Sequence, residues 1–145
     1  MVKKSILYIF IYIILVGCET GLEPTSESEY YLNISAPSLV TDSNGYYHIE
    51  WDDDLQTFTT LRADTGSPDT YQKLGWMSDT EVKVSNTWTN CVNGNSYTDD
   101  TGTAYTVLSV WGILVGDTIT VIAGYHDEFS NHHLDSLKVV VDNEI

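Results

Sequence analysis

Three of the four histidines in this chain of 145 residues lie within one short stretch, HDEFSNHHLD. Its metal-ligating residue types, in order, are His126, Asp127, Glu128, His132, His133 and Asp135. Imidazole and carboxylate groups suit zinc or a similar divalent ion, and a hairpin loop would bring His126 opposite His132 or His133. One hypothesis is therefore a metal site made by the three histidines and Asp127. We prefer the alternative, a solvated loop with titrating histidines, because the spacing matches no recognised ligand pattern.

Aspartates also gather in segments with turn chemistry, and clustered carboxylates beside glycine can bind calcium in extracellular modules. The segments are Asp42-Ser43-Asn44-Gly45, Asp52-Asp53-Asp54 and Asp99-Asp100. The segment that begins at Asp42 lacks the spacing of an EF-hand loop and its glutamate at position twelve. Weak calcium binding is therefore the most that these aspartates predict, and we expect no obligatory cofactor.

The sequence contains no motif typical of a catalytic centre. It has no nucleophile elbow, no phosphate-binding glycine loop and no Ser, His and Asp in a triad order. Paired carboxylates for glycoside hydrolysis need a set separation in space, which spacing along a sequence does not show. We therefore expect a protein that is not an enzyme. A metal-dependent enzyme would have to use the cluster from His126 to Asp135.

Aromatic residues are the main candidates for ligand binding, because the chain has 4 Trp and 10 Tyr. Exposed rings stack on a sugar or on a partner protein and offer a large contact area at low entropy cost. Trp76 and Trp88 are flanked by glycine and polar residues, so we predict that both indoles are exposed. Trp51 and Trp111 end segments of apolar alternation, and we predict that both belong to the core.

Two tyrosine doublets add a second aromatic candidate, Tyr30-Tyr31 and Tyr46-Tyr47. Adjacent residues of a strand point to opposite faces of the sheet. If Tyr30 and Tyr47 join the core, Tyr31 and Tyr46 face outward as an external pair that could bind a ligand. The alternative, which we favour, is a cross-strand tyrosine pair that only supports the sheet.

The elements that must position these residues are strands, because apolar and polar residues alternate with a period of two through most of the chain after residue 29. We predict strands over 30–35, 46–51, 56–63, 71–77, 80–85, 103–111, 118–126 and 136–141. One face of the seventh strand carries Ile119, Val121, Ala123 and Tyr125, and one face of the eighth carries Leu137, Val139 and Val141. Because turn residues recur between the strands and no segment shows a helical stripe, the pattern predicts an all-β sandwich.

The first 17 residues predict a secretory leader, with Lys3 and Lys4 before an apolar segment from Ile6 to Val16. At about eleven residues the segment is shorter than the roughly 20 that span a membrane. Its end, Leu15-Val16-Gly17-Cys18, resembles the lipobox of bacterial lipoproteins. That resemblance implies that diacylglycerol is attached to Cys18, which then becomes the first mature residue. The alternative is an ordinary signal peptide that leaves a free thiol at the new N-terminus.

Residues 18–29 follow as an acidic segment without hydrophobic periodicity, which we predict to be a flexible tether. Acidic residues after the lipidated cysteine resemble the surface-export signals of lipoproteins of Bacteroidota. The two resemblances together imply a lipid-anchored protein of the outer membrane, displayed at the cell surface.

Charge and cysteine content limit the partners of the mature chain. The formal charge is −15, and loss of Lys3 and Lys4 with the leader makes it −17. Nucleic acid and anionic lipid headgroups are poor partners for such a surface. Besides Cys18 the chain has only Cys91, so no internal disulfide is available to the domain. We predict that Cys91 is a small buried hydrophobe, because no neighbour in sequence would activate it.

The run GDTITVIAGYHDEFSNHHLDSLKVVV resembles the last two strands of bacterial immunoglobulin-like and fibronectin type III-like domains. Trp51, at the end of YYHIEW, is similar in position to the core tryptophan on the second strand of the fibronectin-like domains. The resemblance implies a single antiparallel immunoglobulin-like sandwich over residues 30–145, after the leader and tether. The segment NTWTNCVNGNSYTDDTG has no counterpart, so the strand order over residues 70–102 is not predicted.

Three classes of function are compatible with these features. We rank first a non-catalytic surface lipoprotein that acts as a binding or accessory module for a glycan or an outer-membrane protein complex. A structural or adhesion subunit of a cell-surface assembly comes second, because the C-terminal VDNEI offers no obvious donor strand. A metal-dependent enzyme comes last.

Overall fold

The computed structural model describes residues 30–51, 57–66, 71–84 and 86–143. All regular elements of these residues are strands. They are β1 (Asn33–Ser35), β2 (Val40–Thr41), β3 (Tyr47–Trp51), β4 (Phe58–Asp64), β5 (Lys73–Ser78), β6 (Glu81–Val84), β7 (Thr87–Asn90), β8 (Asn95–Tyr97), β9 (Thr103–Ser109), β10 (Thr118–His126) and β11 (His132–Asn143). Within the described ranges no helix could cross a membrane. The leader, Cys18, the tether and Asp52-Asp53-Asp54 lie outside the described residues.

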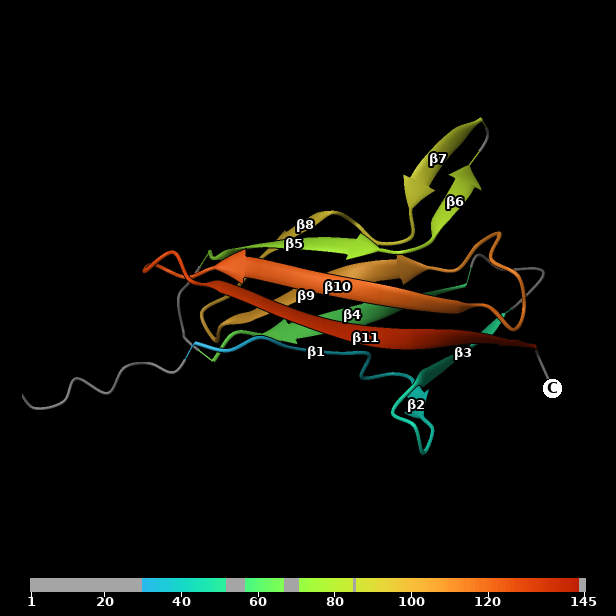
Figure 1. Cartoon of the computed structure of the whole chain (residues 1–145), viewed down its shortest axis with the longest axis horizontal. Coiled ribbons are helices and arrows are strands. Elements are labelled where there is room, and N and C mark those ends of the chain that lie inside the picture. The colour runs from blue at the N-terminus through green and yellow to red at the C-terminus, as the bar shows by residue number, and fades with distance from the viewer. Residues whose placement is uncertain (1–29, 52–56, 67–70, 85, 144–145) are drawn as a thin grey trace, which may run out of the picture.

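Two sheets face each other around one core, and a two-stranded hairpin projects from them (Figure 1). The smaller sheet has the order β1-β4-β9, the larger sheet has the order β2-β3-β11-β10-β5-β8, and β6 pairs with β7. With β1, β4 and β9 as strands A, B and E, and β5, β10 and β11 as C, F and G, this is the strand arrangement of an immunoglobulin-like sandwich. The predicted all-β sandwich is therefore confirmed.

One pairing differs from the antiparallel expectation. Strand β3 runs parallel to β11, with Tyr47 opposite Val139 and Trp51 opposite Asn143. Strand β1 belongs to the smaller sheet and β2 to the larger one, so the chain crosses between the sheets over residues 36–39, before β3. The resemblance to fibronectin-like domains implied that Trp51 lies on the second strand of the sandwich. Because of this crossing, Trp51 lies instead on β3, next to the last strand, β11.

The core consists of alternate residues of the facing strands, as the period-two pattern predicted. Ile119, Val121, Ala123 and Tyr125 of β10 are buried, and so are Leu137, Val139 and Val141 of β11. Strands β4 and β9 of the smaller sheet contribute Leu61, Ala63, Ala104 and Leu108. Cys91 is buried as well, and burial raises the pKa of its thiol, which keeps it protonated and unreactive.

Three turns share one local mechanism, in which an aspartate closes a five-residue loop. The Oδ1 atoms of Asp42, Asp99 and Asp127 each accept backbone N–H groups from the residues two and four positions later, at 2.8–3.1 Å. The residue three positions later has a positive φ, which is 81° at Gly45, 75° at Gly102 and 67° at Ser130. Short polar side chains that bond the following backbone favour such turns, and glycine accepts the left-handed conformation without strain.

The structure corrects two of the four tryptophan predictions. Trp76 is buried with 4% of its surface exposed, because it lies on β5 with its side chain directed to the core, and its glycine neighbour occupies the opposite face. Its indole Nε1 donates to Ser96 Oγ at 2.7 Å. A buried tryptophan on strand C is a hallmark of immunoglobulin domains. Trp111 follows the end of β9 and is exposed, whereas the predictions hold for Trp88, which is exposed, and for Trp51, which packs partly buried on the core.

The external tyrosine pair is also wrong. Tyr31 is exposed beside β1 of the smaller sheet, whereas Tyr46 precedes β3 of the larger one, so the two rings do not pair. Tyr46 instead lies under Lys138, whose Nζ is 5.1 Å from the ring centroid. Tyr30 and Tyr47 pack partly buried against the core, as expected.

Candidate functional site

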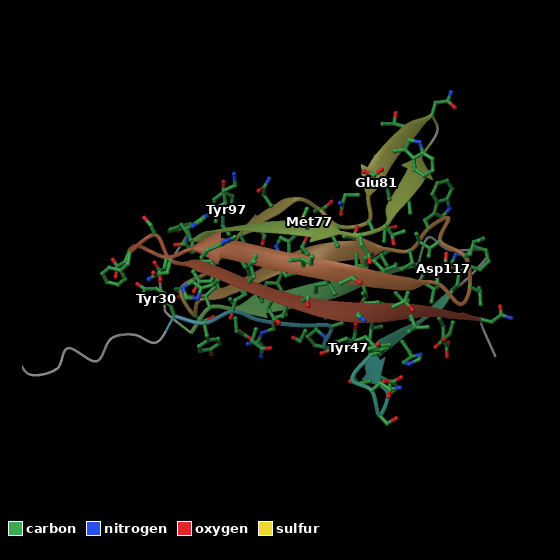
Figure 2. All side chains as sticks on the ribbon, viewed as in Figure 1. Tyr30, Tyr47, Met77, Glu81, Tyr97 and Asp117 are labelled. Carbon is green, nitrogen blue, oxygen red and sulfur yellow. The ribbon has the colours of Figure 1, made fainter. Side chains whose placement is uncertain are left out.

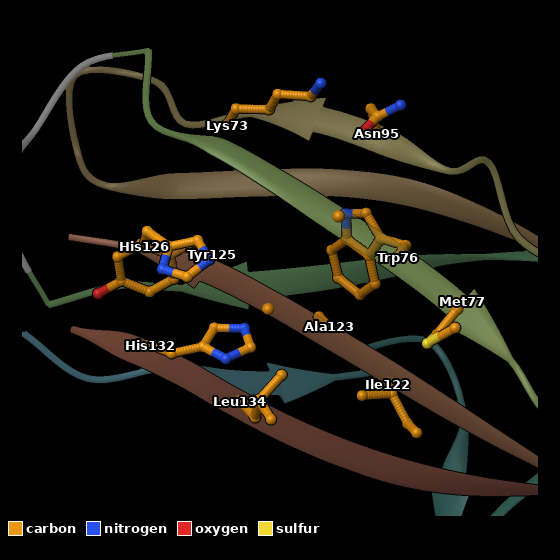
Figure 3. A pocket seen from close by; sticks show the side chains of 12 residues that line it. Lys73, Trp76, Met77, Asn95, Ile122, Ala123, Tyr125, His126, His132 and Leu134 are labelled. Carbon is orange, nitrogen blue, oxygen red and sulfur yellow. The ribbon is translucent and has the colours of Figure 1, made fainter. Parts of the chain in front are cut away.

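The outer face of the larger sheet contains a hollow of about 490 Å³ that crosses β8, β5, β10 and β11 (Figure 3). Its volume lies within the range of about 300–1,000 Å³ that is usual for small-molecule sites. The residues that line it are Lys73, Gly75, Trp76, Met77, Asn95, Ile122, Ala123, Gly124, Tyr125, His126, His132 and Leu134. Three of these residues are core residues whose side chains lie beneath the hollow: Trp76, Ala123 and Tyr125.

Two glycines on neighbouring strands create the hollow. Gly75 of β5 is directly opposite Gly124 of β10, so the sheet has two adjacent outward positions without a side chain. Asn95 of β8 stands beside Gly75, and Leu134 of β11 stands beside Gly124. The backbone of the glycine pair thus forms a floor between two side-chain walls. A glycine inside a strand often marks a close approach of a ligand or another group.

The two glycines differ in how much room surrounds them. A Cβ atom on Gly124 would lie 2.6 Å from Leu134 Cδ2, 3.2 Å from the carbonyl oxygen of His133 and 3.3 Å from His132 Nε2. A Cβ atom on Gly75 would meet nothing closer than the Gly124 carbonyl oxygen at 3.9 Å. The Leu134 side chain and the His133 backbone therefore leave little room for a side chain at Gly124, whereas the space above Gly75 is open.

One end of the hollow is polar and basic. His126 is opposite His132, and their imidazole rings stack with centroids 4.5 Å apart and an interplanar angle of 11°. The pairing of β5 with β10, continued by two residues from the glycine pair, places Lys73 across from His126. Figure 3 shows Lys73 along one rim and the two histidines along the other side.

The opposite end of the hollow is apolar. Met77 and Ile122 are paired across β5 and β10, and Leu134 extends this surface from β11. The exposed fractions of Met77 and Leu134 are 56% and 62%, which is high for side chains of this type. None of the residues that line the hollow is Asp or Glu, although the chain has 21 such residues.

The predicted metal set is divided between the two faces of the larger sheet. His132 and His133 are neighbours in β11, so their side chains point to opposite faces, and only His132 stacks on His126. His133 stacks on Tyr125 with ring centroids 4.9 Å apart, and its Nε2 is 2.9 Å from Asp127 Oδ2. In the described part of the chain no three His, Cys, Asp or Glu side chains form a group that could hold a metal ion.

Asp127 is held as a carboxylate inside the β10–β11 loop. Burial raises its pKa, but bonds from His133, the side chain of Asn131 and the backbone N–H groups of Asn131 and Phe129 outweigh burial and lower the pKa to about 2. Asp42 and Asp99 use their Oδ1 atoms for backbone N–H groups in the same manner. These two aspartates of the calcium hypothesis thus already have partners in the turns that they close.

A second exposed surface, here called the distal apolar end, lies away from the hollow. It consists of Phe58, Trp88, Trp111, Leu114 and Val115, all exposed. Asp117 and Glu81 mark this end in Figure 2, opposite Tyr30, where the described chain begins. Backbone hydrogen bonds from Val110 to Thr57 and from Ser109 to Cys91 join its loops, and Trp88 lies on the projecting β6–β7 hairpin.

No known family model matches this chain, and the search of curated proteins finds no match. The site therefore has to be interpreted from its own geometry.

Sequence reasoning found part of the hollow and missed the rest. A hairpin was expected to bring His126 opposite His132 or His133, and in the structure His132 is the residue opposite His126. Gly75, Gly124 and the apolar wall were missed. A signal was present, because each glycine interrupts a segment that otherwise reads as a continuous strand.

Proposed function

We propose that this protein is a non-catalytic binding module, anchored to the outer membrane through lipid on Cys18 and displayed at the cell surface, that takes its ligand in the hollow. The lipobox and the tether support the location. The observation that carries the function is the glycine-floored hollow, with its exposed apolar wall and its basic end.

The hollow has features that stability alone does not require. Met77 and Leu134 leave more than half of their surfaces in water, whereas Leu74 and Trp76 on the other face of β5 are buried. Exposed apolar side chains grouped around a concavity mark ligand-binding grooves. The polar groups of Lys73, Asn95 and the histidines converge on the same concavity and would orient a bound molecule.

A ligand screen by thermal shift tests this function. A ligand that binds only the folded chain raises the melting temperature by mass action. We expect at least one compound from a panel of neutral sugars, acidic sugars and amphiphiles to stabilise the wild type. Gly75→Val, which places a branched side chain in the open space above the floor, should abolish the shift. A ligand that stabilises wild type and Gly75→Val equally would contradict binding in the hollow.

An accessory subunit of an outer-membrane protein complex is the second candidate, and the distal apolar end favours it. Phe58 pairs with Ser109 at the end of β9, and Trp111, Leu114 and Val115 follow in the loop before Asp117. Figure 2 shows Asp117 far from Tyr30, the residue that follows the tether. A tethered module would therefore direct this surface away from its own anchor. A photoreactive residue at position 114 should crosslink to a membrane protein in intact cells, whereas one at position 138 should not.

A structural or adhesion subunit has less support from the edges of the larger sheet. Strands β2 and β8, which border the larger sheet, contain only two and three residues. Short edge strands offer few free backbone groups for the addition of a neighbour's strand.

A further inference from the structure

We propose that the ligand of the hollow is a small amphiphilic anion, whose carboxylate lies at the Lys73 end and whose apolar body lies over Gly75 and against Leu134. This inference rests on the proposed function, because it names the chemical class that the same hollow would bind. Strand register, charge and the distribution of polar groups each support it.

The register arranges the outward side chains of four strands in rows. The first row contains two pairs, Lys73 with Tyr97 and His126 with His132, which lie just beyond the last pair of β5 with β10. The second row runs from Asn95 through Gly75 and Gly124 to Leu134, and the third contains Met77 and Ile122. A molecule that lies along the strands over the glycine floor thus has a basic row at one end and an apolar row at the other (Figure 3). A ligand that matches this gradient is itself amphiphilic.

The charge of the basic row determines whether the head group of the ligand is an anion or a cation. Lys73 is the only formally charged side chain that lines the hollow, and the lining contains no carboxylate. Lys73 forms no salt bridge with a carboxylate of the described residues, unlike Arg62, whose Nη2 is 2.8 Å from Asp64 Oδ1. A concavity with low-dielectric walls concentrates the field of such a charge and raises the local concentration of its counterion. A ligand carboxylate would therefore be attracted to Lys73 although the whole molecule is acidic.

The distribution of polar groups makes a neutral glycan a poorer match. A sugar ring has hydroxyl groups around its whole edge, and each hydroxyl that loses water without a new partner weakens binding. In the hollow the polar side chains are Lys73, Asn95, His126 and His132, whereas Met77, Ile122 and Leu134 offer no hydrogen bond. The apolar row instead suits a hydrocarbon body, which gains free energy in proportion to the area that it buries.

Isothermal titration calorimetry with decanoate tests the inference. The protein is the whole mature chain, residues 18–145, with Cys18→Ser so that no detergent is needed, and the probe stays below its micelle concentration. We expect saturable binding of decanoate at one site. Lys73→Gln should weaken it by about tenfold or more, because a hydrogen bond to a charged group is lost. Lys138→Gln removes the same charge from the same face outside the hollow, and should change the affinity less than about twofold.

Two further probes separate the inference from the proposed function. Decyltrimethylammonium has a ten-carbon chain with the opposite charge, and glucose is a neutral sugar of comparable bulk. If either binds at least as tightly as decanoate and Gly75→Val abolishes that binding, the anionic amphiphile is wrong and the binding module stands. If decanoate binds Gly75→Val as it binds wild type, or if no probe binds wild type, the inference is overturned. Binding of decanoate that needs both Lys73 and the open space above Gly75 supports it.

Discussion

At the residue scale, the His133–Asp127 contact organises the loop between β10 and β11. Asp127 accepts bonds from His133, Asn131 and two backbone N–H groups, and His133 in turn stacks on the buried ring of Tyr125. Tyr30, the first described residue, reaches the same loop, because its hydroxyl donates to Glu128 Oε1 at 2.8 Å. The residues that first suggested a metal site therefore stabilise the β10–β11 loop, and Glu128 of this loop binds Tyr30 at the beginning of the domain.

The lowered pKa of Asp127 predicts how stability depends on acid. A carboxylate with a folded-state pKa of about 2, below its ordinary value of 3.8, stabilises the fold above the ordinary value. This contribution is lost as the pH falls through the lower one. Asp127→Asn should lower the free energy of unfolding at neutral pH and reduce its decline between those two values. Urea unfolding at neutral pH and at several pH values between about 2 and 3.8 measures both effects. Asp100→Asn, an exposed neighbour of another turn aspartate, is the control, and an equal loss in the control would contradict the role of Asp127.

Backbone conformation predicts opposite effects at two equivalent turn positions. Ser130 has a φ of 67° in the place where Gly45 has 81°. The left-handed conformation costs a residue with a side chain roughly 1–2 kcal/mol. Glycine avoids this cost, but it loses more backbone entropy on folding, so the net gain from glycine is smaller. Ser130→Gly should therefore raise the free energy of unfolding by about 0.5–1 kcal/mol.

Gly45→Ala is the matched reverse change. No atom lies within 4 Å of a Cβ atom at this position, so any cost is conformational. It should lower the free energy of unfolding by about 1 kcal/mol. Thermal or urea unfolding of both variants checks the pair, and effects of the same sign would contradict the common turn mechanism.

At the element scale, His48 links β3 to two other parts of the larger sheet. Its Nδ1 is 2.7 Å from Asp142 Oδ2 of β11, and its Nε2 is 3.4 Å from Asp42 Oδ2 in the loop between β2 and β3. The longer contact is a charge interaction, because Nε2 has no hydrogen-bond partner of acceptable geometry. The bond to Asp142 raises the pKa of His48 more than burial lowers it, and Asp42 raises it further.

The raised pKa of His48 predicts that β3 loosens as the solution becomes alkaline. A histidine with a raised folded-state pKa stabilises the fold fully below its ordinary value, 6.5, and this stabilisation is lost as the pH rises through the folded-state pKa. Hydrogen exchange, corrected for its intrinsic pH dependence, should show weaker protection of β3 amides at about pH 8 than at about pH 6. His48→Gln should remove the difference. Equal protection at both pH values in the wild type would refute the link.

The two glycines of the hollow predict different tolerance to alanine. Gly124→Ala forces Leu134 aside and presses on the His133 carbonyl, so we expect the free energy of unfolding to fall by about 1–2 kcal/mol. Gly75→Ala meets no close atom and should change it by less than about 0.5 kcal/mol. Urea unfolding of the two variants measures the contrast. Equal losses would show that the glycine pair is needed for the strands themselves and that the space above Gly75 is not free.

The elements predicted best from sequence were the long strands with strict alternation. Strand β10 was predicted at its observed bounds, because its four inward residues are apolar and its turns have clear chemistry. Trp76 is buried against expectation, because Gly75 lies on the opposite face of β5 and says nothing about the exposure of its neighbour. Strand β8, at three residues, is too short to show a period. The parallel pairing of β3 with β11 depends on contacts between residues 92 apart in sequence, which local pattern does not encode.

At the scale of the whole molecule, the two exposed surfaces have different positions relative to the tether. The hollow opens on the side of the sandwich, with its basic row toward the β10–β11 loop that holds Tyr30. The distal apolar end is at the far end of the long axis (Figure 2). An anchored molecule would therefore offer a small ligand access from the side and a protein partner access from the end.

The anchor itself gives a whole-molecule prediction. Mass spectrometry of the N-terminal peptide from cell membranes should find a chain that begins at Cys18 and carries diacylglycerol as a thioether on Sγ. Cys18→Ser should leave the protein unlipidated and move it out of the membrane fraction. A native N-terminal peptide that begins at Cys18 without fatty acid would contradict the anchor, although it would leave the hollow unaffected.

The most direct test of the account is a map of where a ligand binds, from ¹⁵N nuclear magnetic resonance of the mature chain titrated with decanoate. We expect the largest shifts at the amides of Gly75, Gly124 and Asn95, and we expect them to be absent in Gly75→Val. Shifts that gather instead around Trp88 and Leu114, or that spread evenly over the sandwich, would contradict a binding module built on the hollow.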